Sequence, residues 1–70
     1  MRVQNCFGVF EVEQGNVVRF TYHDKIREGS VEYVRLSKEG KAIVNLIQPD
    51  DDRGFVSFRV DRMQSAIELV

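Results

Sequence analysis

Apolar and polar side chains alternate along several short stretches of the chain, with the two-residue period of a β-strand. Residues 17–22 place Val18, Phe20 and Tyr22 on one face, and residues 55–60 repeat this alternation. Because only one face of each stretch is strongly apolar, each predicts a strand that lies with one face against a core.

Three other stretches also predict strands, although their patterns differ. Residues 42–47 are largely apolar on both faces, which predicts a strand at the centre of a sheet or next to a second layer. Residues 7–13 predict a strand near the N-terminus. Residues 66–70 predict a last strand that carries Ile67 and Leu69 on one side.

Polar segments that contain Gly, Pro, Asn or Asp separate these stretches and predict turns. The segments are residues 14–16, 23–30, 38–41 and 49–54. Residues 61–65 contain neither Gly nor Pro, and they predict a single 3₁₀ turn that Asp61 caps through its carboxylate.

The order of these elements predicts one all-β domain over residues 1–70. Five to six short antiparallel strands with a 3₁₀ turn before the last strand indicate a small SH3-like or Sm-like barrel. Residues 1–13 either complete this barrel or pair with another chain, and the pattern favours neither arrangement.

The composition supports a β fold, since the chain has 11 Val and 5 Phe against 2 Ala and 3 Leu. A net charge of −1 disfavours a general nucleic-acid coat, although it leaves room for a local basic patch. No apolar run reaches the length of a membrane span, so we expect no membrane partner. The single cysteine, Cys6, predicts a reducing, cytoplasmic setting, and we expect its side chain to be buried.

The residues that most often carry catalysis or bind metals form no recognisable set. His23 stands beside Asp24 in a predicted loop, without a nucleophile placed by any known signature, so we expect no enzyme activity. Residues 50–52 are three adjacent aspartates, which predict a polar turn because their spacing differs from that of a calcium loop. Paired Cys and His ligands are absent, and we expect neither a metal nor a cofactor.

Several arginines fall in or beside predicted strands, where a charge is less easily accommodated than in a loop. Arg35, Arg59 and Arg62 are such residues, and Tyr22 and Tyr33 supply aromatic rings on neighbouring strands. Arginine binds phosphate or carboxylate through two parallel hydrogen bonds, and aromatic rings stack on nucleic-acid bases. The alternative is that these arginines form ion pairs with carboxylates on neighbouring strands.

One segment of the chain resembles a known family. Residues 58–63 read Phe-Arg-Val-Asp-Arg-Met and are followed by a short apolar strand, which resembles the C-terminal part of WYL domains. Residues 17–22 resemble the first strand of that domain, and residues 33–36 resemble its second. The tripeptide that names the family is absent, since residues 42–44 read Ala-Ile-Val at its expected place.

The resemblance implies a fold and a class of function. WYL domains are Sm-like barrels of bacterial and phage regulators that bind nucleic acids or nucleotides through arginines, usually behind a DNA-binding helix-turn-helix. The arginines that match by position are Arg59 and Arg62, with Arg35 as a third. The resemblance therefore implies a stand-alone relative without the DNA-binding part.

These observations lead to two hypotheses for function. The first is a small non-enzymatic binding module that contacts an anionic ligand, a nucleotide or single-stranded nucleic acid through Arg35, Arg59, Arg62, Tyr22 and Tyr33. The second is a protein–protein interaction module, a phage or bacterial regulator that docks on a host protein or self-associates as a homo-oligomer.

Overall fold

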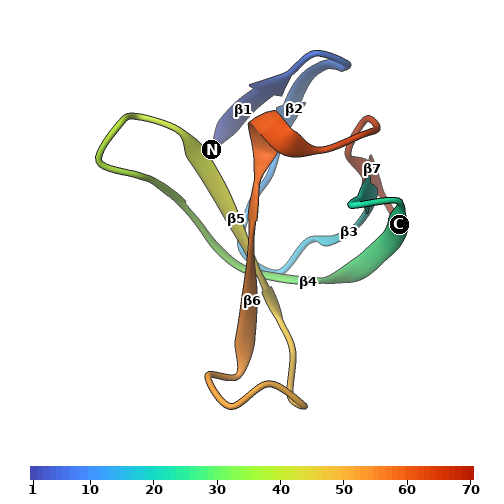
Figure 1. Cartoon of the computed structure of the whole chain (residues 1–70), viewed down its shortest axis with the longest axis vertical. Helices are drawn as coiled ribbons and strands as arrows, with labels where there is room; N and C mark the ends of the chain where they lie inside the picture. Colours follow the sequence, from blue (N-terminus) through green and yellow to red (C-terminus); the bar gives the residue numbers. More distant parts are fainter.

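The computed structural model describes residues 1–70, which form strands and one 3₁₀ turn. The elements are β1 (Arg2–Asn5), β2 (Gly8–Glu11), β3 (Val17–Tyr22), β4 (Lys25–Leu36), β5 (Ala42–Ile47), β6 (Phe55–Arg59), η1 (Val60–Arg62) and β7 (Glu68–Leu69). Strands β1 and β2 form a hairpin, and the other five form an antiparallel sheet in the order β6-β5-β4-β3-β7 (Figure 1). The structure has no helix that could span a membrane.

Strand β4 is shared by both halves of the sheet. Its first half, Lys25–Ser30, pairs with β3, and its second half pairs with β5 from Val31 onward. The register shifts between Val31 and Tyr33, which marks a β-bulge. A bulge bends a strand and increases its twist, so the sheet curls back on itself. This curvature brings the two edges of the sheet toward each other around one core.

The core contains the alternate side chains that the hydrophobic pattern selects. Eleven buried residues form one cluster, which includes Val18 and Phe20 of β3, Val44 and Leu46 of β5, and Phe58 of β6. The remaining members come from β4, from the N-terminal hairpin and from the segment around η1. They are Val3, Val12, Val31, Val60, Met63 and Ile67.

The N-terminal hairpin covers one end of this core. Val3 and Val12 are both buried, and the Asn5 side-chain amide donates a hydrogen bond of 3.3 Å to the carbonyl oxygen of Ser65. Val12, which directly follows β2, is therefore held in the core, and β1 lies next to η1. Residues 1–13 thus pair within the chain and complete the domain.

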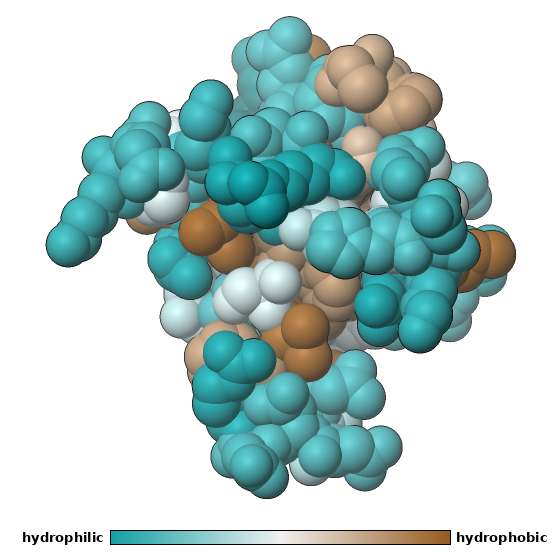
Figure 2. All heavy atoms as spheres, in the orientation of Figure 1, coloured by the Kyte–Doolittle hydropathy of each residue, from teal (hydrophilic) through white to brown (hydrophobic).

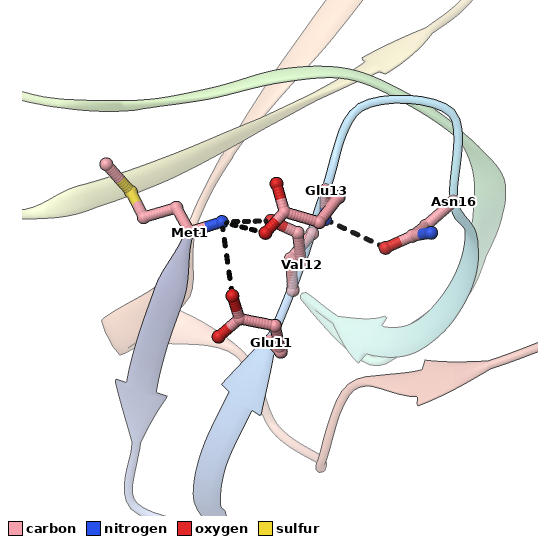
Figure 3. A network of polar contacts seen from close by, with 5 residues as sticks. All are labelled: Met1, Glu11, Val12, Glu13 and Asn16. Atoms are coloured by element: carbon pink, nitrogen blue, oxygen red, sulfur yellow. Dashed lines mark hydrogen bonds and ion pairs between the residues drawn. The ribbon is translucent and has the colours of Figure 1, made fainter.

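A polar network holds the start of β1 to the end of β2 (Figure 3). The Met1 ammonium donates to the Val12 carbonyl oxygen at 2.8 Å and to Glu13 Oε1 at 2.7 Å. Glu11 Oε1 lies 3.8 Å from the same ammonium, and Asn16 Oδ1 accepts from the Glu13 backbone N–H. The hydrogen bond from the ammonium lowers the pKa of Glu13 below its usual value.

Side chains, rather than a backbone ladder, close the gap between β3 and β6. The Phe58 ring centre lies 5.2 Å from that of Phe20 and 5.0 Å from that of Tyr22, both in edge-to-face geometry. The Arg59 backbone N–H donates to the Tyr22 hydroxyl at 3.4 Å. We call these contacts of Phe20, Tyr22, Phe58 and Arg59 the seam. The sheet is therefore barrel-like but incompletely closed.

The structure confirms the all-β fold class and most of the expected elements. The strands expected at 17–22 and 42–47 have those bounds, and the latter lies inside the sheet between β6 and β4. The strand expected at 55–60 ends at Arg59, because Val60 already begins the 3₁₀ turn. That turn precedes the last strand, as expected.

The long turn expected at residues 23–30 is wrong. His23 and Asp24 alone form the turn, with φ values of 50° and 64°, and Tyr22 pairs directly with Lys25. Two residues with positive φ are typical of a tight hairpin turn whose twist matches that of the strands. The polar residues after Asp24 therefore belong to β4, whose exposed face accommodates their charges.

Three smaller expectations are also wrong. Asp61 does not cap the 3₁₀ turn, because its carboxylate pairs with the Arg59 guanidinium instead. Cys6 is exposed, since it lies in the turn between β1 and β2. Ile67 is buried whereas Leu69 is 66% exposed, because regular pairing in β7 begins only at Glu68.

Candidate binding face

The sheet formed by the second half of β4 with β5 and β6 has a face that points away from the core. The register places eight side chains there, in three rows that run across the strands. We call this set the outer face, and it consists of Tyr33, Arg35, Ile43, Asn45, Ile47, Phe55, Ser57 and Arg59. Its central strand, β5, is covered on the opposite side by the core.

Two arginines flank one apolar residue at one end of the outer face. Arg35 of β4 and Arg59 of β6 are both cross-strand partners of Ile43. Neighbouring strands lie about 4.8 Å apart, so the two backbones are separated by about 9.6 Å. Ile43 is only 8% exposed although it lies outside the core cluster, so its neighbours on the outer face must cover it. The stems of the two arginines are placed to do this.

The two arginines differ in how their charges are satisfied. Arg59 donates from Nε to Asp61 Oδ1 at 3.1 Å and from Nη2 to Asp61 Oδ2 at 2.8 Å. This pair lowers the pKa of Asp61 and raises that of Arg59, in both cases chiefly through the side-chain hydrogen bond. Arg35 is exposed and has no carboxylate within ion-pair distance. Its full charge is therefore available to a ligand.

The middle row of the outer face is polar. Asn45 is 1% exposed, and its Oδ1 accepts a hydrogen bond of 2.8 Å from the Ser57 hydroxyl. Its Nδ2 is buried and has no hydrogen-bond partner. An unsatisfied buried donor costs about 1–3 kcal/mol. The centre of the outer face thus contains an amide donor that the protein itself does not use.

Aromatic rings lie on both outer strands of this sheet. Tyr33 of β4 is 42% exposed and follows the bulge, while Phe55 of β6 is partly buried. The Arg53 guanidinium lies over the Phe55 ring, with Cζ 5.4 Å from the ring centre. Arg53 is held there by Asp51, which accepts from its Nε at 3.2 Å. Asp51 of this turn therefore positions an arginine, in agreement with the polar turn expected there.

The outer face itself contains no acidic side chain, although the chain has 11 Asp and Glu. The carboxylates beside it are Asp61, which Arg59 engages, Glu39, which also helps to raise the pKa of Arg59, and Glu32 at the bulge. The structure has no pocket and no cluster of side chains that could hold a metal ion. In Figure 2, polar side chains cover most of the visible surface, and apolar ones appear near its centre and at the tip of the N-terminal hairpin. A ligand of this protein therefore meets an open surface.

The structure brings together only part of the set of residues expected to bind a ligand. Arg35, Arg59 and Tyr33 share the outer face. Tyr22 lies in the seam, where its ring packs on Phe58 and stacks on His23. Arg62 is exposed on η1, next to the N-terminal hairpin.

Sequence reasoning missed several residues of this face. Alternation along β5 puts Asn45 on the same side as Ile43 and Ile47, so its place on one face could be read from the pattern. The pairing of Asn45 with Ser57 and Tyr33 could not be read from the pattern, because cross-strand register depends on the bulge and on the length of each turn.

Comparison of the chain with protein-family models, with curated proteins and with solved structures finds no match.

Proposed function

We propose that the protein is a non-enzymatic binding module that holds single-stranded nucleic acid on the outer face. The observation that carries this proposal is the register, which groups Tyr33, Arg35, Phe55 and Arg59 on one open surface without an acidic residue. The segment 58–63, which resembles the C-terminal part of WYL domains, supports the same class of ligand.

The geometry suggests a role for each side chain. A base stacks on Tyr33, since base–aromatic stacking tolerates any sequence, whereas the Arg53 guanidinium already lies over the Phe55 ring. Phosphates bind to Arg35, whose guanidinium is free, and to the part of Arg59 that Asp61 leaves accessible. A flat surface without a pocket suits an extended strand better than a free nucleotide, because small ligands are bound in concave sites.

The first test measures binding of fluorescent oligo-dT and oligo-U by anisotropy at two salt concentrations. Two phosphate contacts on a single strand give a slope of about −1.4 in log K against log salt. The affinity is then expected to fall about sevenfold between about 50 and 200 mM salt. Absence of binding at the lower salt concentration would refute the proposal.

Two substitutions and one control locate the interface. Arg35→Ala removes a phosphate contact and is expected to flatten the salt dependence, and Tyr33→Ala is expected to weaken binding by about 1–3 kcal/mol. Arg2→Ala changes the net charge by the same amount as Arg35→Ala, but Arg2 is exposed on β1 of the N-terminal hairpin and is not one of the eight outer-face residues. If Arg2→Ala weakens binding as much as Arg35→Ala, the contact is a general charge effect and the proposed interface is wrong.

A second candidate function is supported by a different surface. Phe7, 52% exposed, and Val9 lie at the turn of the N-terminal hairpin and expose apolar area to solvent. We propose docking on a protein, or self-association, as the alternative function for this surface. Light scattering over a range of concentrations tests self-association: a mass that rises with concentration in the native chain but not in Phe7→Ser would favour it over the monomeric binding module.

A further inference from the structure

A second group of cations, Lys25 and Arg27 of β4, lies on the core side of the sheet near the turn between β3 and β4. Arg27 of β4 is paired with Phe20 of β3, and its side chain therefore points to the core side of the sheet. Its Cζ lies 5.6 Å from the centre of the Phe58 ring. We call the surface formed by Tyr22, Lys25, Arg27 and Phe58 the mouth.

The guanidinium of Arg27 has no polar partner in the protein. It forms no ion pair, and none of its N–H groups donates a side-chain hydrogen bond. Its Nε is buried without a partner, whereas its two Nη atoms are not among the buried atoms that lack one. Arginine has five N–H donors, and a partly buried arginine normally satisfies several of them. The Nη end of Arg27 is thus free to bind an acceptor that comes from outside.

The charges around Arg27 also favour an anion. Lys25 lies two residues earlier on the same face of β4, about 6.8 Å along the strand. The carboxylate of Asp24 accepts a hydrogen bond from Gln64, and Glu28 lies on the other face of β4, where it pairs with Arg19. Neither Lys25 nor Arg27 has a carboxylate within ion-pair distance.

We propose that the mouth binds an oxyanion, a carboxylate or a phosphate, through the two Nη atoms of Arg27. The oxyanion accepts two parallel hydrogen bonds from the guanidinium, which stays over the Phe58 ring, and Lys25 adds a second positive charge. This site is separate from the outer face, because Phe58 and Arg59 are consecutive residues of β6 and point to opposite sides of the sheet. It therefore goes beyond the proposed function.

The test follows the side-chain Nε–Hε signals of the seven arginines by NMR in the folded chain. Sodium phosphate and sodium acetate are titrated separately against sodium chloride at constant ionic strength and pH. We expect the Arg27 signal to shift to saturation with at least one oxyanion, while the signal of Arg19, which is already paired, moves little. Saturation with phosphate alone, with acetate alone or with both identifies the class of anion.

Two variants and a control complete the experiment. Arg27→Met retains an unbranched side chain against Phe58 and removes the guanidinium. The ring signals of Tyr22, which lies in the mouth, and of His23, which stacks on Tyr22, are expected to shift to saturation in the native chain and not in Arg27→Met. Lys25→Gln is expected to lower the affinity for the anion by about two- to fivefold. Arg19→Met, on the other face of the sheet, is expected to change nothing.

One result of the native titration is sufficient to refute the proposal, so the test does not depend on the folding of any variant. If the Arg27 signal moves in proportion to anion concentration, or moves equally with chloride, the mouth contains no oxyanion site. If the ring signals of Tyr22 and His23 still shift to saturation in Arg27→Met, the proposal is refuted equally.

Discussion

The Phe58→Ala substitution tests how far the stability of the fold depends on the seam. Replacement of a buried Phe by Ala costs about 3–5 kcal/mol, since it removes apolar contact and leaves a cavity. Phe58 is buried and packs edge-to-face on two rings, which places the expected cost in the upper part of that range. A domain of this length has a total stability of about 3.5–10 kcal/mol. The substitution is therefore expected to remove close to half of it or more.

Urea unfolding followed by circular dichroism measures this effect. The free energy of unfolding is extrapolated linearly to water, and the midpoint shifts at constant slope if only stability changes. Phe7→Ala is the matched control, because it deletes the same atoms from a side chain that is 52% exposed. Its expected cost is below about 0.5 kcal/mol.

The comparison of the two phenylalanines decides whether side chains close the sheet. If Phe58→Ala costs less than about 1 kcal/mol, or no more than Phe7→Ala, the ring contacts of the seam do not hold β6 against β3. The account of an incompletely closed barrel would then be wrong.

Three further predictions concern the backbone, the ion pair and the hydroxyl group of the seam. Gly8→Ala is expected to destabilise the protein by about 1–3 kcal/mol in urea unfolding, because Gly8 has a φ of +146° and an added Cβ would lie 3.3 Å from Cζ of Phe10. Gly29→Ala is the control: its added Cβ meets only ordinary contacts, so the substitution is expected to be neutral or stabilising. The lowered pKa of Asp61 means that its pair with Arg59 contributes stability above the usual aspartate pKa, and that this contribution disappears as the pH falls through the lowered pKa. Asp61→Asn is expected to remove that part of the acid dependence, and an unchanged pH profile would contradict it. Tyr22→Phe removes the acceptor of the Arg59 backbone N–H and is expected to cost about 0.5–1.5 kcal/mol while oligonucleotide binding stays unchanged; weaker binding would place Tyr22 in the interface.

The strands could be predicted wherever the alternation of apolar residues is regular. Residues 17–22 and 42–47 are clear examples, since their buried positions repeat every second residue or run continuously. The first half of β4 could not be predicted in this way. Residues 25–30 carry charges on both faces, because one face is solvent-exposed and the other reaches the open mouth.

The candidate binding face could be predicted only in part. Arg35 and Tyr33 stand two residues apart, so a strand alone puts them on one face. Their proximity to Arg59 depends on the register through β5, which the bulge after Val31 shifts by one residue. The ion pair of Arg59 agrees with the alternative expected for the arginines, although its partner Asp61 lies two residues along the chain, where the strand turns into η1, and not on a neighbouring strand.

Strand β4 has a consequence for how the chain can be cut and rejoined. Its first half pairs with β3 and its second half pairs with β5, so it joins the two parts of the sheet. A break inside it would separate two hairpins, and neither is expected to be stable alone. The β4–β5 turn around Gly40 is exposed and is bridged by hydrogen bonds between Ser37 and Lys41. A circular permutation that opens the chain at Gly40 should therefore preserve the fold, whereas one that opens it at Glu32 should yield an unfolded chain.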